Sequence, residues 1–195
     1  MGKYTIEPIN PDYEKKYNVL HGASFASITA YQEQANIAVT ALISNLDGLK
    51  GALGREETWD DTTCSKLVES FDTSTTEINN AMAAIDGKCP GAVGALEALK
   101  SALDEYKTAY DAYVEAATSY GHTEGGEPEP KTQTQNTYDD NGKVTGTTQV
   151  ETYYHKKWAA ELAEKDGIAS AALEALNTAE AAVPGAISAA KGALS

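Results

Sequence analysis

Residues 53–62, with the sequence Leu53-Gly54-Arg55-Glu56-Glu57-Thr58-Trp59-Asp60-Asp61-Thr62, form a short polar break between two long helical patterns. Upstream, apolar residues recur at heptad spacing in two columns: Ile28, Ala35, Leu42 and Leu49, and Val39, Leu46 and Leu53. Downstream, the stripe resumes in a new phase with Leu67, Phe71, Ile78, Met82 and Ile85. Because short connections make neighbouring helices antiparallel, we expect a helical hairpin with its bend at 54–62. Trp59 is expected to wedge between the helix ends at this bend.

The pattern as a whole predicts a mainly α protein, an antiparallel helical bundle built on this long hairpin, with a small polar β-hairpin inserted before the last helix. Residues 22–120 are predicted to form the hairpin and bundle, with the first helix running from near Gly22 to near Leu53. Asp60 and Asp61 stand where carboxylates cap free amides and meet the positive end of the helix dipole. We interpret both aspartates as structural rather than catalytic.

A second break is predicted at residues 87–91, Gly-Lys-Cys-Pro-Gly, because glycine caps a helix and proline cannot continue it. The helix after it carries a heptad column of Leu96, Leu103, Tyr110 and Ala117 beside a second column of Leu99, Tyr106, Tyr113 and Tyr120. A buried tyrosine needs a partner for its hydroxyl or an edge open to water. Two interpretations remain: an interface with another chain, or an ordinary core whose hydroxyls reach solvent. The candidate partner interface is Phe71, Tyr106, Tyr110, Tyr113 and Tyr120.

The two ends of the chain and the segment 121–152 differ in composition from the helical part. Residues 1–21 are predicted to be an extended N-terminal arm, because Pro8 and Pro11 disfavour helix before them; the arm either packs on the bundle or is only partly ordered. Residues 121–152 are predicted to be a linker and a β-hairpin turning at 139–142, which either lies on the bundle or projects from it. Residues 153–195 are predicted to be a helix returning to the bundle, broken at Pro184.

Charge and apolar content exclude several classes of function. The formal net charge is -14, from 29 acidic and 15 basic residues, which argues against nucleic acid and anionic membranes and favours basic partners. We find no apolar run of transmembrane or signal-peptide length, so no membrane span is expected. From composition alone, we expect the chain to be either cytoplasmic or exported by a route that does not use a classical signal peptide.

No constellation of residues predicts an enzyme, a cofactor, a metal site or a small-molecule site. His21, His122 and His155 do not share helical spacing with another ligand, which argues against zinc. Cys64 and Cys89 would lie about 37 Å apart along one helix, too far for an intrachain disulfide. We interpret Cys64 as a small apolar residue, because Asp60 and Asp61 oppose any lowering of a thiol pKa there.

The hairpin resembles the WXG superfamily of small helical proteins exported by type VII (ESX-like) secretion systems, and the related LXG-type domains. The resemblance covers roughly Ala23 to Tyr120, and it is carried by Trp59 at the bend, by Phe71 twelve residues later and by the heptad columns. Asp61 stands where the family usually has glycine, and the break at 87–91 also departs from the family pattern. The family's export signal is Tyr-x-x-x-Asp/Glu, which Tyr120 and Glu124 match.

The resemblance implies association as the function: pairing with a like hairpin, or with the helical N-terminal region of a toxin, and travel to a secretion machine. It also implies a protein that is cytoplasmic before export and then secreted or at the cell surface without a classical signal peptide. The partner would be another helical protein or a second copy of the chain. The alternative from another class is a self-assembling or pore-forming helical bundle with the β-hairpin as its tongue. The polar hairpin counts against entry into lipid, whereas its strand edges are compatible with self-assembly.

Overall fold

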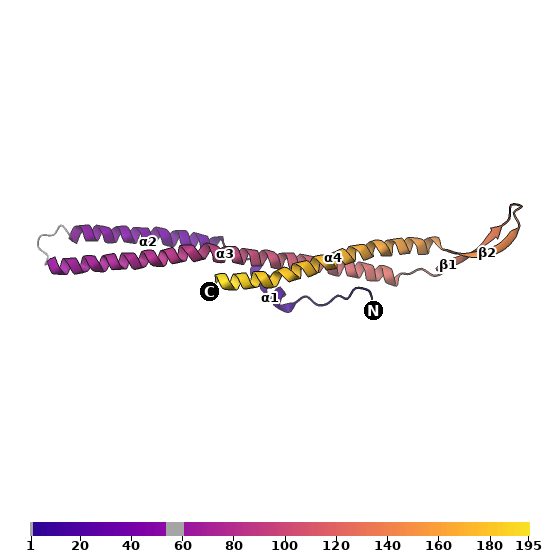
Figure 1. The fold of residues 1–195 in the computed structure, drawn as a ribbon, viewed down its shortest axis with the longest axis horizontal. Coiled ribbons are helices and arrows are strands. Elements are labelled where there is room, and N and C mark those ends of the chain that lie inside the picture. Colours follow the sequence, from indigo (N-terminus) through magenta and orange to yellow (C-terminus); the bar gives the residue numbers. More distant parts are fainter. Residues whose placement is uncertain (1, 54–60) are drawn as a thin grey trace. The chain divides into compact units, whose positions relative to one another are not determined.

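The structure is a computed structural model that describes residues 2–53 and 61–195. Its elements in chain order are α1 (Pro11–Leu20), α2 (Ala26–Leu53), α3 (Asp61–Gly125), β1 (Thr132–Tyr138), β2 (Val144–Glu151) and α4 (Tyr153–Ala193) (Figure 1). The prediction of a mainly α fold built on a long helical hairpin, with a β-hairpin before the last helix, is confirmed. Trp59, Asp60 and the predicted bend at 54–60 lie outside the described residues.

The chain divides into two compact units, which we describe separately. The first unit comprises Met1–Val19 with Ser101–Gly185, and the second comprises Leu20–Lys100 with Ala186–Ser195. Helices α3 and α4 each contribute residues to both units. In the part of the chain that the structure describes, no helix has both the length and the apolar character needed to cross a membrane.

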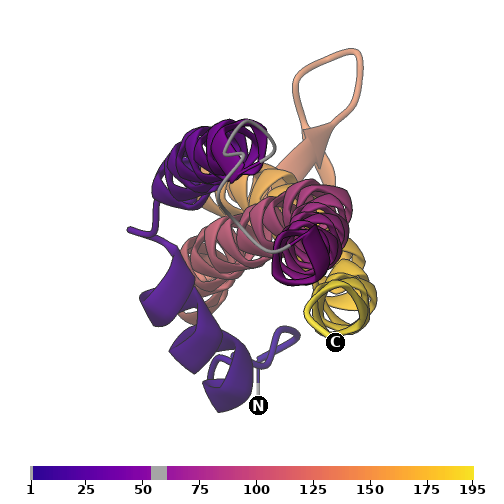
Figure 2. The ribbon, with the colours of Figure 1, turned by 90° about the vertical axis from the view of Figure 1, so that its left-hand side faces the viewer.

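In the second unit, α2 runs antiparallel to the first part of α3, and Figure 2 shows the two helices end on. Polar pairs join the helices along their length: Lys50 binds Asp72 at 2.6 Å, and Gln32 and Asn36 both donate to Asp86, at 2.7 and 3.0 Å. The apolar column of Val39, Leu46 and Leu53 is half-buried, whereas the column of Ile28, Ala35, Leu42 and Leu49 is exposed. The hairpin therefore packs with only one of its two predicted columns.

In the first unit, the C-terminal part of α3 packs against α4. Trp158 of α4 donates its indole N–H to the carbonyl of Thr123 at 2.6 Å, and farther along the pair Ala169 is completely buried beside Ala116 and Tyr120. The buried apolar residues that form the core of this unit are Leu103, Tyr106, Tyr113, Ala116, Ala117, Tyr120, Ala169, Leu176 and Val183. Small alanines let the two helices approach closely, and the tyrosines supply the volume.

The predicted break at 87–91 is wrong, because α3 runs without interruption from Asp61 to Gly125 with Pro90 inside it. A proline in a helix removes one hydrogen bond and costs about 3 kcal/mol, but this cost is local. Pro90 and Asp86, whose carbonyl has no N–H partner at Pro90, are both exposed residues. The predicted break at Pro184 is wrong for the same reason, since α4 continues to Ala193 and Pro184 is also exposed.

Two further boundaries differ from the prediction. The arm predicted for residues 1–21 contains helix α1, which starts at Pro11 and is capped by Asn10, whose side-chain oxygen accepts the amide of Asp12 at 3.0 Å. Proline suits the first position of a helix, where its missing N–H has no intrahelical partner, so only the residues before Pro11 are kept out of a helix. At the other boundary, α3 continues four residues past Gly121, into the predicted linker.

The β-hairpin forms as predicted, with β1 antiparallel to β2 and Gln133 paired with Val150. The register shifts between Thr137 and Tyr138, and Gly142 closes the turn with a φ of 77°, which favours glycine. Asp139 stabilises the turn by accepting the amides of Asn141 and Lys143 through its carboxylate, at 3.0 and 2.9 Å. All strand residues are exposed except Val150, which is half-buried, so the hairpin projects beyond the ends of α3 and α4 in its unit (Figure 1).

Candidate functional site

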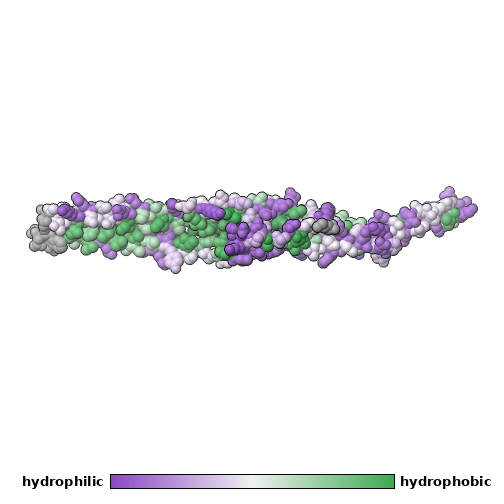
Figure 3. Space-filling model, turned by 90° about the horizontal axis from the view of Figure 1, so that it is seen from below, coloured by the Kyte–Doolittle hydropathy of each residue, from purple (hydrophilic) through white to green (hydrophobic). Residues whose placement is uncertain are grey.

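The first candidate surface is the exposed column of α2, which we call the hairpin face and define as Ile28, Ala35, Leu42 and Leu49. Leu42 is 47% exposed and Leu49 is 55% exposed, and none of the 28 residues of α2 is buried. Figure 3 shows apolar surface along the part of the molecule formed by α2 and the first part of α3. An apolar stripe wider than the contact with one neighbour is typical of a helix that has a second neighbour.

Helix α3 faces α2 with an apolar stripe of its own. Phe71, which the sequence predicts as an interface residue, is half-buried in this stripe with Leu67 and Ile78. Phe71 therefore contributes first to packing within the hairpin, and contact between Phe71 and another protein stays a prediction. Ile85, farther along α3, is 46% exposed.

The second candidate surface is the tyrosine face, which we define as Tyr106, Tyr110, Tyr113 and Tyr120 of α3. The structure brings all four to one side of the helix and covers them with the chain's own N-terminal segment Lys3–Asn10, here called the strap. Tyr113 donates to the carbonyl of Thr5 at 2.8 Å, Tyr110 donates to the carbonyl of Glu7 at 3.1 Å, and Tyr106 accepts the amide of Asn10 at 3.1 Å. Tyr106 and Tyr113 are each 4% exposed.

The beginning of the strap is held by Asp166 of α4. Lys3 binds the Asp166 carboxylate at 2.5 Å, and the Tyr4 hydroxyl donates to the same carboxylate at 2.7 Å. The hydrogen bonds from Lys3 and Tyr4 hold the pKa of Asp166 below its ordinary value. The bond to the carboxylate, which requires the protonated phenol, raises the pKa of Tyr4. The Tyr4 ring also packs edge-on against Tyr120, with 5.1 Å between ring centroids.

The residues of the predicted export signal, Tyr120 and Glu124, lie on one side of α3 because the helix continues through Gly121. The Tyr120 hydroxyl donates to the Glu124 carboxylate at 3.3 Å. Burial first, and then the Glu124 charge, raise the pKa of Tyr120. Since Tyr120 is buried under Tyr4, its ring is already in use in the core, and a role for the pair in export stays a prediction.

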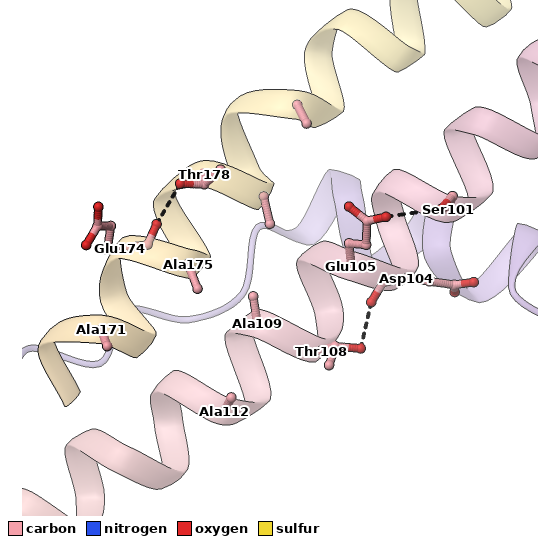
Figure 4. Close-up of a pocket in the computed structure, with 12 residues that line it drawn as sticks. Ser101, Asp104, Glu105, Thr108, Ala109, Ala112, Ala171, Glu174, Ala175 and Thr178 are labelled. Atoms are coloured by element: carbon pink, nitrogen blue, oxygen red, sulfur yellow. Dashed lines mark hydrogen bonds between the residues drawn. The ribbon is translucent and has the colours of Figure 1, made fainter. Parts of the chain in front are cut away.

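The third candidate surface is a groove between α3 and α4, on the helix pair of the first unit (Figure 4). Its volume is about 860 Å³, and its lining residues include Ala109, Ala112, Ala175, Glu105 and Glu174. Its hydroxyls bond within their own helices, as Thr178 does to the carbonyl of Glu174 at 2.9 Å. The predictions missed this groove, although the alanine spacing of three and four residues was its signal; helix crossing decides whether such alanines are covered.

The described residues contain no cluster of three or more His, Cys, Asp or Glu side chains placed to hold a metal ion. His155 lies at the base of the β-hairpin, with Nε2 3.5 Å from a Glu127 oxygen and Nδ1 3.7 Å from a Glu151 oxygen. Its Nδ1 is buried and makes no hydrogen bond. Cys64 and Cys89 are free and half-buried. We find no arrangement of a nucleophile and a base among these groups.

Trp59 and Asp60 lie outside the described residues, and of Asp61 only the position as first residue of α3 is described. Comparison with known proteins found no matching family model, no matching characterised protein and no matching solved structure.

Proposed function

We propose that this chain is a non-enzymatic association protein whose helical hairpin pairs with another helical protein. The observation that carries the proposal is the hairpin face: one of the two heptad columns of α2 packs on α3, and the other is exposed along the whole helix. The resemblance to the WXG and LXG proteins supports a more specific role, as a substrate or partner in a type VII-like secretion system.

The physical reason for pairing is apolar area. Burying apolar surface stabilises a complex by roughly 25 cal/mol per Å², and two helices alone cover only one side of each other. A second helical hairpin, laid along the hairpin face, would complete a four-helix arrangement in which both columns of α2 are covered. A partner that covers the exposed column would also account for its heptad spacing, which the internal packing of the hairpin does not require.

The charge of the chain favours a particular kind of partner. With a net charge of -14, two copies of the chain repel each other, whereas a hairpin with lysine or arginine beside its apolar stripe is attracted. We therefore favour a different helical protein over a second copy. The self-assembling alternative stays open as the outcome of the experiment below.

The experiment measures solution mass by light scattering after size exclusion, for the chain alone and co-expressed with helical proteins encoded beside its gene. We expect a monomer alone and a complex of defined stoichiometry with one such protein. The double variant Leu42→Glu/Leu49→Glu should reduce the complex at least tenfold, because it places charges in the buried stripe.

The matched control is Ile37→Glu/Ser44→Glu, which adds the same charge at the same seven-residue spacing on the opposite side of α2. Ile37 is 70% exposed, so this variant should leave the complex intact. Equal loss of the complex in both variants would contradict a role for the hairpin face. A large oligomer of the chain alone, with no complex, would instead favour the self-assembling alternative.

A further inference from the structure

The tyrosine face recognises the strap through main-chain atoms. Three hydroxyls, at Tyr106, Tyr110 and Tyr113, meet the amide or carbonyl groups of three strap residues, Asn10, Glu7 and Thr5. Residues 5–10 form no helix or turn, and the bonds go to main-chain groups, so they do not depend on which side chains Thr5, Glu7 and Asn10 carry. Such a row of polar groups on an apolar face has the chemistry of a binding site for an extended peptide.

Selectivity is concentrated at the two ends of the strap. At the first end, a lysine and a tyrosine meet the Asp166 carboxylate, and the tyrosine ring packs on Tyr120. At the second end, Asn10 caps helix α1, and the ring of Tyr13 packs edge-on against Tyr106 with 5.4 Å between centroids. A ligand for this face thus carries a basic residue followed by an aromatic one, then an extended stretch, then a helix start.

The strap does not fill the site that it covers. A cavity of about 460 Å³ remains between the strap and the two helices, lined by Pro8 of the strap, Tyr110 of α3 and Leu173 of α4. The anchor is also accessible, since the side chains of Lys3 and Asp166 are 53% and 35% exposed. An ion pair exposed to water contributes little net free energy. A segment held by hydrogen bonds over a cavity exchanges more readily than a packed core element.

We propose that the tyrosine face is a binding site for an extended peptide, and that Lys3–Asn10 is its tethered and exchangeable ligand. The competing ligand is the same segment of a second copy of the chain, which carries the same end groups. Tethering gives the resident strap an effective concentration in the millimolar range, so a free segment competes poorly until the strap is weakened. The proposal rests on the first unit and does not depend on pairing through the hairpin face.

The test uses two full-length chains, the natural one and a variant with residues 3–10 replaced by glycine and serine at equal length. A fluorescein-labelled peptide of residues 2–13 is titrated into each, and binding is followed by fluorescence anisotropy. We expect saturable binding with one site per chain, at least tenfold tighter for the variant than for the natural chain. Adding Tyr106→Phe, Tyr110→Phe and Tyr113→Phe should weaken peptide binding at least tenfold, because three hydrogen bonds are lost.

A matched control replaces Tyr153 and Tyr154 of α4 by phenylalanine. These side chains are 72% and 73% exposed, so peptide binding should not change. A peptide with alanine at the positions of Lys3 and Tyr4 should bind at least fivefold more weakly than the natural sequence. Absence of saturable binding to a variant whose circular dichroism shows intact helices would overturn the proposal.

If the chain with the glycine and serine segment does not fold, the proposal is tested by hydrogen exchange in a chain that keeps its natural residues 3–10. Within the strap, the Asn10 amide donates to the Tyr106 hydroxyl, so Tyr106→Phe should speed exchange of this amide at least fivefold, as followed by NMR, and leave the amides of α3 and α4 unchanged. Unchanged exchange in the strap would overturn the proposal. So would a loss of protection throughout both helices, since the tyrosines would then be ordinary core residues.

Discussion

Asp166 shows how one residue holds a segment that is distant in sequence. Its carboxylate accepts hydrogen bonds from Lys3 and Tyr4, and the carbonyl of the same residue lies 3.0 Å from the Tyr4 hydroxyl, so that it shares the single Tyr4 proton with the carboxylate. These bonds favour the charged carboxylate, so the pKa of Asp166 is lower in the folded chain than in the unfolded one. The stabilisation is present above the unfolded pKa and is lost as the pH falls through the lowered folded pKa.

We therefore predict that acid releases the start of the strap. The Tyr4 ring resonances, followed by NMR between pH 5 and pH 2, should show a step at a pH below the ordinary aspartate value of about 3.9. Asp166→Asn is the control, because the amide cannot titrate and the step should vanish. A step that persists in this variant would assign the transition to another carboxylate.

The buried tyrosines show what a single residue's chemistry predicts. Their need for hydroxyl partners follows from the sequence, because a phenol buried without a hydrogen bond is costly. The identity of the partner does not follow, since Tyr113 and Thr5 are 108 residues apart. Sequence periodicity describes neighbours on one helix and contains no information about a strap from the other end of the chain.

At the scale of the element, helix α3 continues through a sequence that contains two glycines and a proline within five residues. Local signals for a helix end are worth about 1 kcal/mol for each glycine and about 3 kcal/mol for proline. Helix formation is cooperative. Helical turns before and after residues 87–91 that are stabilised by packing therefore keep the weak turn between them helical. The prediction failed here because it weighed local propensity without that packing.

A continuous α3 predicts that Pro90→Ala stabilises the protein, by about 2 to 3 kcal/mol, because alanine restores the missing hydrogen bond. The gain is below the full propensity difference because alanine also frees the unfolded chain. Urea unfolding measures the change. Gly87→Ala is the matched comparison, with an expected gain of about 1 kcal/mol, since a Cβ there meets nothing within 4 Å. A smaller gain for Pro90→Ala than for Gly87→Ala would indicate a helix already interrupted at residue 90.

The β-hairpin, in contrast to α3, is an element that local sequence signals predict correctly. Its turn at Asp139 to Gly142 and its bulge depend on residues within a few positions of one another, and the prediction from sequence is confirmed in type and nearly in bounds. The structure adds that both strands are exposed apart from half-buried Val150. Its polar strands are compatible with that exposure, because they have no apolar face to bury.

At the scale of the whole molecule, the buried side chains are unevenly distributed. Helix α2 has no buried residue, whereas the part of α3 in the first unit contributes Leu103, Tyr106 and Tyr113 among others to a core. Local opening costs least free energy where few apolar contacts are lost. The hairpin of the second unit thus has the exposed area that an association protein requires.

We predict that native-state hydrogen exchange is at least tenfold faster in α2 than in residues 103–120 of α3. The measurement is made by mass spectrometry at several protein concentrations, so that any protection by self-association is visible. Equal protection at the lowest concentration would show that α2 is as well covered as the first unit, and would remove the basis for the hairpin face.

The sequence by itself determined what depends on spacing within about one or two helical turns: the helical columns, the antiparallel hairpin, the polar β-hairpin and the tyrosine seam. The tertiary structure decided which column stays exposed, what covers the tyrosines, and whether Pro90 and Pro184 end their helices. The physical reason is range. Propensity and periodicity act between near neighbours. Covering a helix face, or continuing a helix through a proline, depends instead on packing against segments that lie 22 to 108 residues away in the sequence, and the energy of that packing exceeds the local preferences.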